Sequence, residues 1–180
     1  MGEIREPESK ILSLDDLEHI RRENKDKKIV FTVGCYDLIH KGHIFFLNEC
    51  AKLGDLLIVG LARDSTIKLL KGPGRPLNSE LNRLQLVSSL QNVDYTVLHP
   101  DMVAENREAE YLSTKMDFKE ILEKLRPDFF ALGYDTVSSE GKRKMCEELG
   151  IKVHTITKSV NDDQNKPLSS TSIIQRARKD

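Results

Sequence analysis

Short apolar runs alternate with segments of helical periodicity along this chain. The runs are rich in β-branched and aromatic residues and apolar on both faces, which predicts strands of a parallel sheet covered on both sides. The predicted strands cover residues 28–33, 55–62, 93–98, 128–133 and 152–156. In the segments around them, apolar residues recur at helical spacing. The predicted helices cover residues 13–24, 43–52, 79–91, 117–125, 139–150 and 170–179.

This alternation predicts an α/β fold, a doubly wound sheet of about five parallel strands with helices on both faces. In such a sheet, ligands bind beyond the carboxyl ends of the strands, where the strand order reverses. We expect one domain over residues 11–180 and a flexible arm over residues 1–10. Ser170 or Thr171 is the expected N-cap of the last helix. The polar segment 99–116 is long for a loop, which favours a lid, a dimer contact or an acceptor-specific insertion.

The composition narrows the possible partners. A net charge of −1 over 180 residues argues against a broad electrostatic surface for nucleic acid. No apolar run approaches the length of a membrane span, and the first residues lack the apolar core of a secretory signal. The three cysteines are widely spaced, which predicts neither a disulfide framework nor a zinc cluster. We therefore expect a cytoplasmic protein with no nucleic-acid or membrane partner.

The stretch GCYDLIHKGH (34–43) follows the first predicted strand and enters the next helix. His40 and His43 are three positions apart, so their rings face the same way if the turn is helical. A helix N-terminus attracts phosphate, and two imidazoles beside it can donate hydrogen bonds to phosphate oxygens. Gly42 has no side chain, so phosphate can approach the backbone. The stretch predicts a polyphosphate site. A chance pair on a loop is one alternative, and a metal site is a weaker one.

The same stretch resembles the H-x-G-H motif of the cytidylyltransferase-like nucleotidyltransferases. KGPGRP (71–76) and the upstream stretch from residue 10 are similar to one subgroup of that family, the bacterial heptose-phosphate adenylyltransferases. SSTSII (169–174) resembles the family's S-T-T-x-I-I stretch. H-x-G-H alone is a weak pattern, but these motifs in this order are specific together. The resemblance covers residues 10–178, nearly the whole chain.

The resemblance implies a Rossmann-like fold and transfer of AMP or CMP from ATP or CTP to a small phosphorylated acceptor, with Mg²⁺ as cofactor and pyrophosphate as product. His40 and His43 would hold the triphosphate, and Lys71 would reach its phosphates. Asp37 would lie near the metal or the acceptor, and a homodimer is expected. Carried over by position, the nucleotide-binding residues are Gly34, Cys35, Tyr36, Asp37, Gly42, Arg83, Gly133, Asp135, Ser169, Ser170 and Thr171.

Several of these residues have simpler interpretations. Lys71 could be a solvated surface charge, and Arg83 a salt-bridged helix residue. Asp135 could shape a turn after a strand, and Cys35 could serve only in packing. Displacement at phosphorus needs positioning and charge neutralisation more than a protein nucleophile. The cationic and hydrogen-bonding residue types of the motifs suit that chemistry.

Three departures from the family pattern leave the substrates open. Val33 stands where the heptose subgroup has a polar residue. LGYDT (132–136) replaces the usual G-G-D-Y and is closer to archaeal flavin-adenine-dinucleotide synthases and some polyol-phosphate cytidylyltransferases. An arginine that often precedes the S-T-T stretch is missing, and Lys158 or Lys166 is its possible replacement.

The leading interpretation is a nucleotidyltransferase acting on a sugar phosphate or polyol phosphate, most like the heptose 1-phosphate adenylyltransferases. A glycerol-phosphate-type cytidylyltransferase and an FMN adenylyltransferase are the alternatives among enzymes. A nucleotide-binding regulatory protein is the alternative outside the enzymes. No sugar kinase sequence is present, so we do not expect a bifunctional arrangement in this chain.

Overall fold

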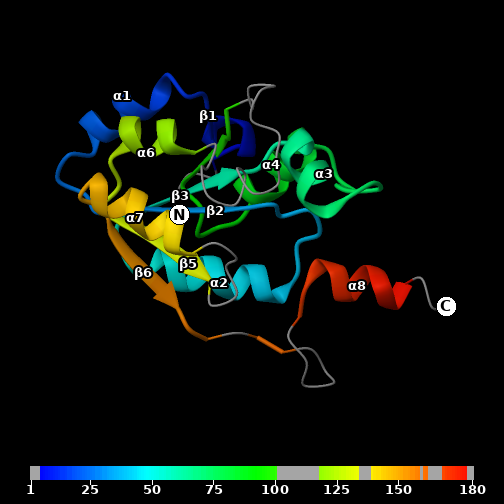
Figure 1. Ribbon diagram of the computed structural model, residues 1–180. Helices are drawn as coiled ribbons and strands as arrows, with labels where there is room; N and C mark the ends of the chain where they lie inside the picture. Colours follow the sequence, from blue (N-terminus) through cyan, green and yellow to red (C-terminus); the bar gives the residue numbers. More distant parts are fainter. Residues whose placement is uncertain (1–4, 101–117, 134–138, 159, 162–167, 178–180) are drawn as a thin grey trace.

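The computed structural model describes residues 5–100, 118–133, 139–158, 160–161 and 168–177. Its strands form one parallel sheet in the order β1-β4-β3-β2-β5-β6 (Figure 1). This confirms the predicted Rossmann-like α/β fold. The strands are β1 (Ile11–Leu12), β2 (Ile29–Gly34), β3 (Leu56–Leu61), β4 (Tyr95–Leu98), β5 (Phe129–Gly133) and β6 (Lys152–Ile156).

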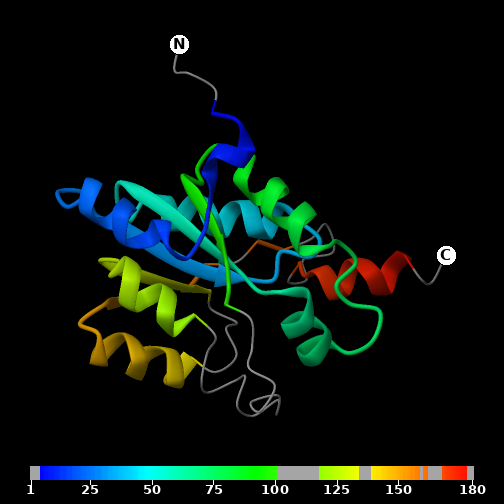
Figure 2. The same cartoon turned by 90° about the horizontal axis from the view of Figure 1, so that it is seen from above.

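Helices cover both faces of the sheet (Figures 1 and 2). The helices α1, α6 and α7 contribute to one cluster of buried apolar side chains, and α2 and α4 contribute to the other. The short helix α3 follows β3, and α8 closes the described chain. The helices are η1 (Pro7–Lys10, a 3-10 helix), α1 (Asp16–Glu23), α2 (Lys41–Ala51), α3 (Asp64–Lys71), α4 (Glu80–Ser88), α6 (Lys119–Leu125), α7 (Ser139–Glu148) and α8 (Ser170–Ala177).

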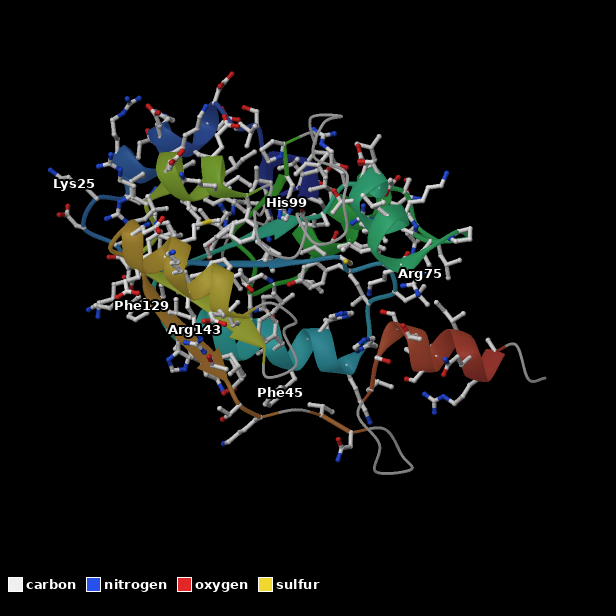
Figure 3. The ribbon with its side chains drawn as sticks, in the orientation of Figure 1. Lys25, Phe45, Arg75, His99, Phe129 and Arg143 are labelled. Atoms are coloured by element: carbon white, nitrogen blue, oxygen red, sulfur yellow. The ribbon has the colours of Figure 1, made fainter. Side chains whose placement is uncertain are left out.

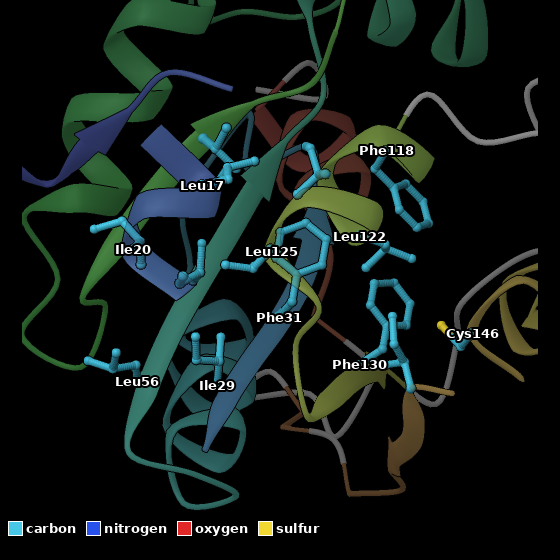
Figure 4. Packing of buried hydrophobic residues seen from close by; sticks show 14 of the residues in the cluster. Leu17, Ile20, Ile29, Phe31, Leu56, Phe118, Leu122, Leu125, Phe130 and Cys146 are labelled. Carbon is cyan, nitrogen blue, oxygen red and sulfur yellow. The ribbon is translucent and has the colours of Figure 1, made fainter. Parts of the chain in front are cut away.

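The central strands are buried on both faces. In β2, Ile29 and Phe31 belong to the cluster under α1, α6 and α7, whereas Val30 belongs to the cluster under α2 and α4. Phe31, Phe118 and Phe130 pack together with ring centroids 5.4 to 6.4 Å apart (Figure 4). Burial on both faces explains why these strands appear in the sequence as continuous apolar runs rather than alternating ones.

The strand order reverses between β2 and β5. The strands β3 and β4 lie on one side of β2, whereas β5 and β6 lie on the other. The connections that leave the carboxyl ends of β2 and β5 therefore diverge, and the space between them is the usual ligand site of such sheets. The stretch 34–43 leaves β2 at this point, as the sequence predicted.

The amino-terminal segment differs from the prediction. Residues 7–10, expected as part of a flexible arm, form η1 and contact α4. Lys10 is buried, and its ammonium group donates hydrogen bonds to the carbonyl oxygens of Leu90 and Val93. Residues 7–10 are therefore not part of a flexible arm. The acceptors of Lys10 lie 80 and 83 positions further along the chain, so the local sequence could not indicate them.

Two further elements had no predicted counterpart. The strand β1 has only two residues and pairs with β4 at the edge of the sheet, which makes six strands instead of about five. The helix α3 buries only Thr66 and Ile67, too few positions for a helical period. Nearly all of the polar segment 99–116 lies outside the described residues. None of the described helices is long and apolar enough to cross a membrane.

Candidate active site

A cavity of about 270 Å³, the main cavity, lies beyond the carboxyl ends of β2 and β5. Residues of these strands, among them Val33, Ala131 and Leu132, give it an apolar wall. The first turns of α2 and α8 also line it. The structure thus gathers segments that are far apart in the sequence around one space. The predicted residues that line it are Gly34, Tyr36, His40, Gly42, His43, Lys71, Gly133, Ser169, Ser170 and Thr171.

His40 and His43 stack on each other at the start of α2. Their ring centroids are 3.8 Å apart and their planes differ by 23°. The carbonyl oxygen of His40 accepts hydrogen bonds from the backbone N–H groups of His43 and Ile44, which begins the helix. A Cβ atom on Gly42 would lie 3.0 Å from Cε1 and Nδ1 of His40. Glycine at this position therefore makes room for the His40 ring itself. This explanation for the glycine of the motif was not visible in the sequence.

Both imidazoles are partly withdrawn from water. The Nδ1 atoms of His40 and His43 are buried and have no hydrogen-bond partner among the described residues. Burial lowers the pKa of His40. Burial, followed by the charges of His40 and Lys71, lowers the pKa of His43 to about 4. At neutral pH both rings are therefore uncharged, and each carries one N–H donor and one acceptor nitrogen.

The lowered pKa of His43 makes stability depend on pH. Below its usual pKa of about 6.5, an unfolded histidine binds a proton, whereas native His43 binds one only near pH 4. The free energy of unfolding should therefore fall as the pH is lowered from about 6.5 to about 4, by at most about 1.4 kcal/mol per pH unit for this residue. Urea denaturation at several pH values, on the unmodified chain and on His43→Asn, measures this difference. Equal pH dependence in the two proteins would contradict it.

Asp37 connects the loop after β2 to the segment after α3. Its buried carboxylate accepts hydrogen bonds from Nε of Arg75 and from the backbone N–H groups of Leu77, at 2.7 Å, and Asn78, at 3.0 Å. Burial by itself raises the pKa of Asp37. Hydrogen bonds from Asn78, Arg75 and Leu77 outweigh that effect and leave the pKa below its usual value. Asp37 is therefore an ionised group that holds residues 75–78 against the site.

These contacts bear on the predicted metal. Within the part of the chain that the structure describes, no group of three or more His, Cys, Asp or Glu side chains could hold a metal ion. Both oxygens of Asp37 already accept hydrogen bonds from the protein, which does not favour it as a metal ligand, and that role stays a prediction. Mg²⁺ is often bound mainly through substrate phosphates. The Mg²⁺ requirement stays a prediction, with the ion carried by the nucleotide.

The comparison with known families decides the class of this site. Residues 31–176 match the family described as Cytidylyltransferase-like. The chain belongs to this family. The match begins in β2 and ends in α8, so it includes both histidines and the first turn of α8. The resemblance seen in the sequence is confirmed, and with it the nucleotidyltransferase class.

Curated relatives of this cytidylyltransferase-like chain are longer proteins. The Bifunctional protein HldE of Campylobacter concisus is 34% identical over 94% of this chain and 31% of its own length. The protein of the same name from Helicobacter pylori strain G27 is 41% identical over 71% of this chain and 30% of its own length. The chain thus spans less than a third of the length of these two relatives.

Two solved structures share the fold. A lipopolysaccharide core biosynthesis protein from Thermoplasma volcanium is 32% identical, with a TM-score of 0.60, over 74% of this chain and 99% of its own. Pantoate-beta-alanine ligase from Francisella tularensis is 20% identical, with a TM-score of 0.63, over 94% of this chain and 76% of its own. The second similarity shows the fold alone.

One residue carried over from the cytidylyltransferase-like family, Arg83, does not line the main cavity. Its side chain is 0% exposed. Its guanidinium donates hydrogen bonds to the carbonyl oxygens of Asn78 and Cys35 and to the carboxylate of Asp64, at 3.1, 2.7 and 2.7 Å. In this geometry Arg83 positions the loop after β2 rather than touching phosphate. The predicted phosphate contact stays a prediction that these bonds do not favour.

The first turn of α8 is fixed by serines. The hydroxyl of Ser169 accepts a hydrogen bond from the backbone N–H of Ser172, so Ser169 is the cap, instead of Ser170 or Thr171. The Ser170 hydroxyl donates to the carbonyl oxygen of Leu38, at 3.1 Å. This bond joins α8 to the H-x-G-H loop across 132 positions of sequence.

The remaining predicted residues differ in their positions. Cys35 does not line the main cavity, and burial raises the pKa of its thiol, which agrees with a role in packing. Tyr36 lines the cavity with a left-handed backbone, φ 49°, which is uncommon outside glycine and clusters at functional sites. Asp135 and Lys166 lie outside the described residues.

The sequence missed several cavity residues. Phe45 and Phe46 line the main cavity from α2, and two phenylalanines one residue after H-x-G-H were a usable signal. Lys142 lines it from α7 and is only 7% exposed, but nothing local in the sequence marks a buried lysine. Lys158 also lines the cavity, so it is a cation on the side where the family's arginine is missing.

Proposed function

We propose that this protein transfers a nucleotidyl group from a nucleoside triphosphate to a sugar phosphate or polyol phosphate and releases pyrophosphate. One observation carries the proposal. The stacked pair His40 and His43 shares one cavity with the first turn of α8 and with Lys71. Ring nitrogens, helix-terminal N–H groups and an ammonium group are donors for a chain of phosphates.

The proposed chemistry needs few protein groups. A phosphomonoester acceptor, whose second pKa is about 6, is ionised at neutral pH and needs no general base. One of its oxygens attacks the α-phosphorus, and the bond to the leaving pyrophosphate breaks. His40 and His43 would donate hydrogen bonds to the α-phosphate oxygens as charge develops there, and Lys71 would neutralise charge on the rest of the chain. The apolar wall of the main cavity suits the nucleoside.

We further propose ATP as the donor and a heptose-type sugar phosphate as the acceptor. The similarity to the HldE proteins and to a protein named for lipopolysaccharide core biosynthesis supports a sugar acceptor. KGPGRP supports the adenylyl type, whereas LGYDT favours CTP. Mg²⁺, a cytoplasmic location and a homodimer remain predictions that accompany this proposal.

Pyrophosphate release tests the proposal. The purified chain is incubated with ATP or CTP, with Mg²⁺, and with each member of a panel of sugar 1-phosphates, polyol phosphates and FMN. We expect release that depends on both substrates and is fastest with ATP and a heptose 1-phosphate. Release that is fastest with CTP and glycerol phosphate would instead indicate a glycerol-phosphate-type cytidylyltransferase. Nucleotide binding without release from any pair would favour a regulatory protein.

A further inference from the structure

The ring of Tyr36 lies directly beside the histidine pair. Tyr36 is 3% exposed, its backbone is left-handed, and its ring lies back over Gly34, the last residue of β2. The centroid of this ring is 5.2 Å from that of His43, and the two planes differ by 58°. The His43 ring therefore contacts two other rings, those of Tyr36 and His40.

A glycine makes room for each of the two rings that contact His43. A Cβ atom on Gly34 would lie 2.7 Å from Cε2 of Tyr36, which is closer than real Cβ contacts come. A Cβ atom on Gly42 would lie 3.0 Å from two atoms of the His40 ring. The backbone on both sides of the H-x-G-H loop is therefore shaped to admit these rings, so the contacts with His43 are built into the loop.

Tyr36 also connects the start of α2 to the core. It belongs to the buried apolar cluster under α2 and α4, together with Cys50 near the end of α2. The first turn of α2 carries His43, two positions before the labelled Phe45 (Figure 3). Burial raises the pKa of the Tyr36 phenol well above its usual value, so the phenol is uncharged at working pH. Its ring is thus a fixed apolar surface against which His43 packs.

We propose that Tyr36 is a positioning residue, whose ring holds the His43 imidazole in the orientation that faces the main cavity. Where it concerns the reaction rate, this inference rests on the proposed function. An imidazole that turns freely about its side-chain bonds is aimed at the substrate for only part of the time, and a misplacement of about 1 Å can cost about a hundredfold in rate. Contact with two rings restricts that motion, so the donor is in place before a nucleotide binds.

Histidine NMR of the unliganded protein tests this contact without any substrate. The Cε1–H signal of His43 is identified by its absence in His43→Asn, and the pKa is measured by titration. In the unmodified chain this pKa is about 4, mainly because His43 is buried. We expect Tyr36→Leu to raise it by at least about one unit, toward 6.5, because a ring that is free to move reaches water. Tyr36→Phe should leave it unchanged, since phenylalanine keeps the ring.

Two further variants separate this contact from a general loss of packing. Gly34→Ala keeps Tyr36 but displaces its ring, so it should also raise the pKa of His43, and it carries the test if Tyr36→Leu does not fold. Leu57→Ala opens a cavity in the same apolar cluster, from the amino end of β3, and should leave this pKa unchanged. An unchanged pKa in both Tyr36→Leu and Gly34→Ala, or an equal rise in Leu57→Ala, would overturn the proposal.

Steady-state kinetics then measure what the position of His43 contributes to the rate. With the substrate pair that reacts fastest, Tyr36→Leu should lower kcat about tenfold to a hundredfold and change the KM of the nucleotide by a smaller factor. Tyr36→Phe should match the unmodified chain within about twofold. If Tyr36 acts through His43, adding Tyr36→Leu to His43→Ala lowers kcat no further.

The kinetic outcomes distinguish a positioning role from a direct one. Equal losses of kcat in Tyr36→Phe and Tyr36→Leu would assign the effect to the hydroxyl and overturn the proposal. Additive losses in the double variant with His43→Ala would do the same, because Tyr36 would then act independently of His43. If no substrate pair reacts but the NMR results are as expected, the proposed function fails and the positioning of His43 by Tyr36 stands.

Discussion

Replacement of His43 by alanine is expected to lower kcat for pyrophosphate release about a hundredfold to a thousandfold. The His43 ring lines the main cavity and is neutral at working pH, because burial first, and then His40 and Lys71, depress its pKa. In the proposed reaction it would donate a hydrogen bond to charge that develops at the α-phosphate. A hydrogen bond from such a donor stabilises the transition state more than the ground state, so kcat should fall by a larger factor than KM rises.

The fold should tolerate this change. His43 stacks on His40 at the start of α2, outside both clusters of buried apolar side chains, so a loss of only about 1 kcal/mol in unfolding free energy is expected. His19→Ala is the matched control, because His19 is exposed on α1, away from the site, and pairs with Glu23 on the same helix. A His43→Ala protein with the same kcat as His19→Ala would reject the proposed role of the histidine pair.

Replacement of Arg83 by methionine is expected to lower the free energy of unfolding by about 3 kcal/mol, near the lower limit for removing one member of a buried ion pair. The guanidinium is fully buried and serves the carbonyl oxygens of Cys35 and Asn78 together with Asp64. Without it, two part-buried carbonyl oxygens lose a charged donor. Asp64, with a side chain that is 39% exposed, can still be solvated, which limits the loss. Urea denaturation measures the change.

Arg83→Met also separates the structural role from the predicted phosphate contact. Asn82→Met, one position earlier on α4 and exposed, should change stability by less than about 0.5 kcal/mol. If Arg83 held phosphate instead, its replacement would raise the KM of the nucleotide severalfold while stability matched that of the Asn82 variant. That result would support the predicted phosphate contact of Arg83.

The sequence predicted the sheet because its central strands are buried on both faces, and the resulting apolar runs can be recognised without long-range information. The carboxyl-edge position of His40, Gly42 and His43 followed from the same alternation of strands and helices. The two-residue strand β1 and the short helix α3 were not predictable, because neither carries a full period of apolar positions.

The burial of charged side chains was also not predictable from the sequence. Lys10, Arg83 and Lys142 are buried in the structure, yet in the sequence each looks like an ordinary surface residue. The acceptors of Arg83 include Cys35, which lies 48 positions away. Burial of such a side chain depends on partners that only the tertiary fold supplies, so local pattern cannot distinguish it from a solvated one.

Three hydrogen-bonded attachments converge on the loop that follows β2. Asp37 accepts hydrogen bonds from the segment 75–78. Arg83 donates one to the carbonyl oxygen of Cys35, and Ser170 of α8 donates one to the carbonyl oxygen of Leu38. Folding has thus already removed much of the conformational entropy of this loop. Under the proposed function, little of that entropy would remain to be lost when a nucleotide binds, so more of the contact energy would be available as affinity.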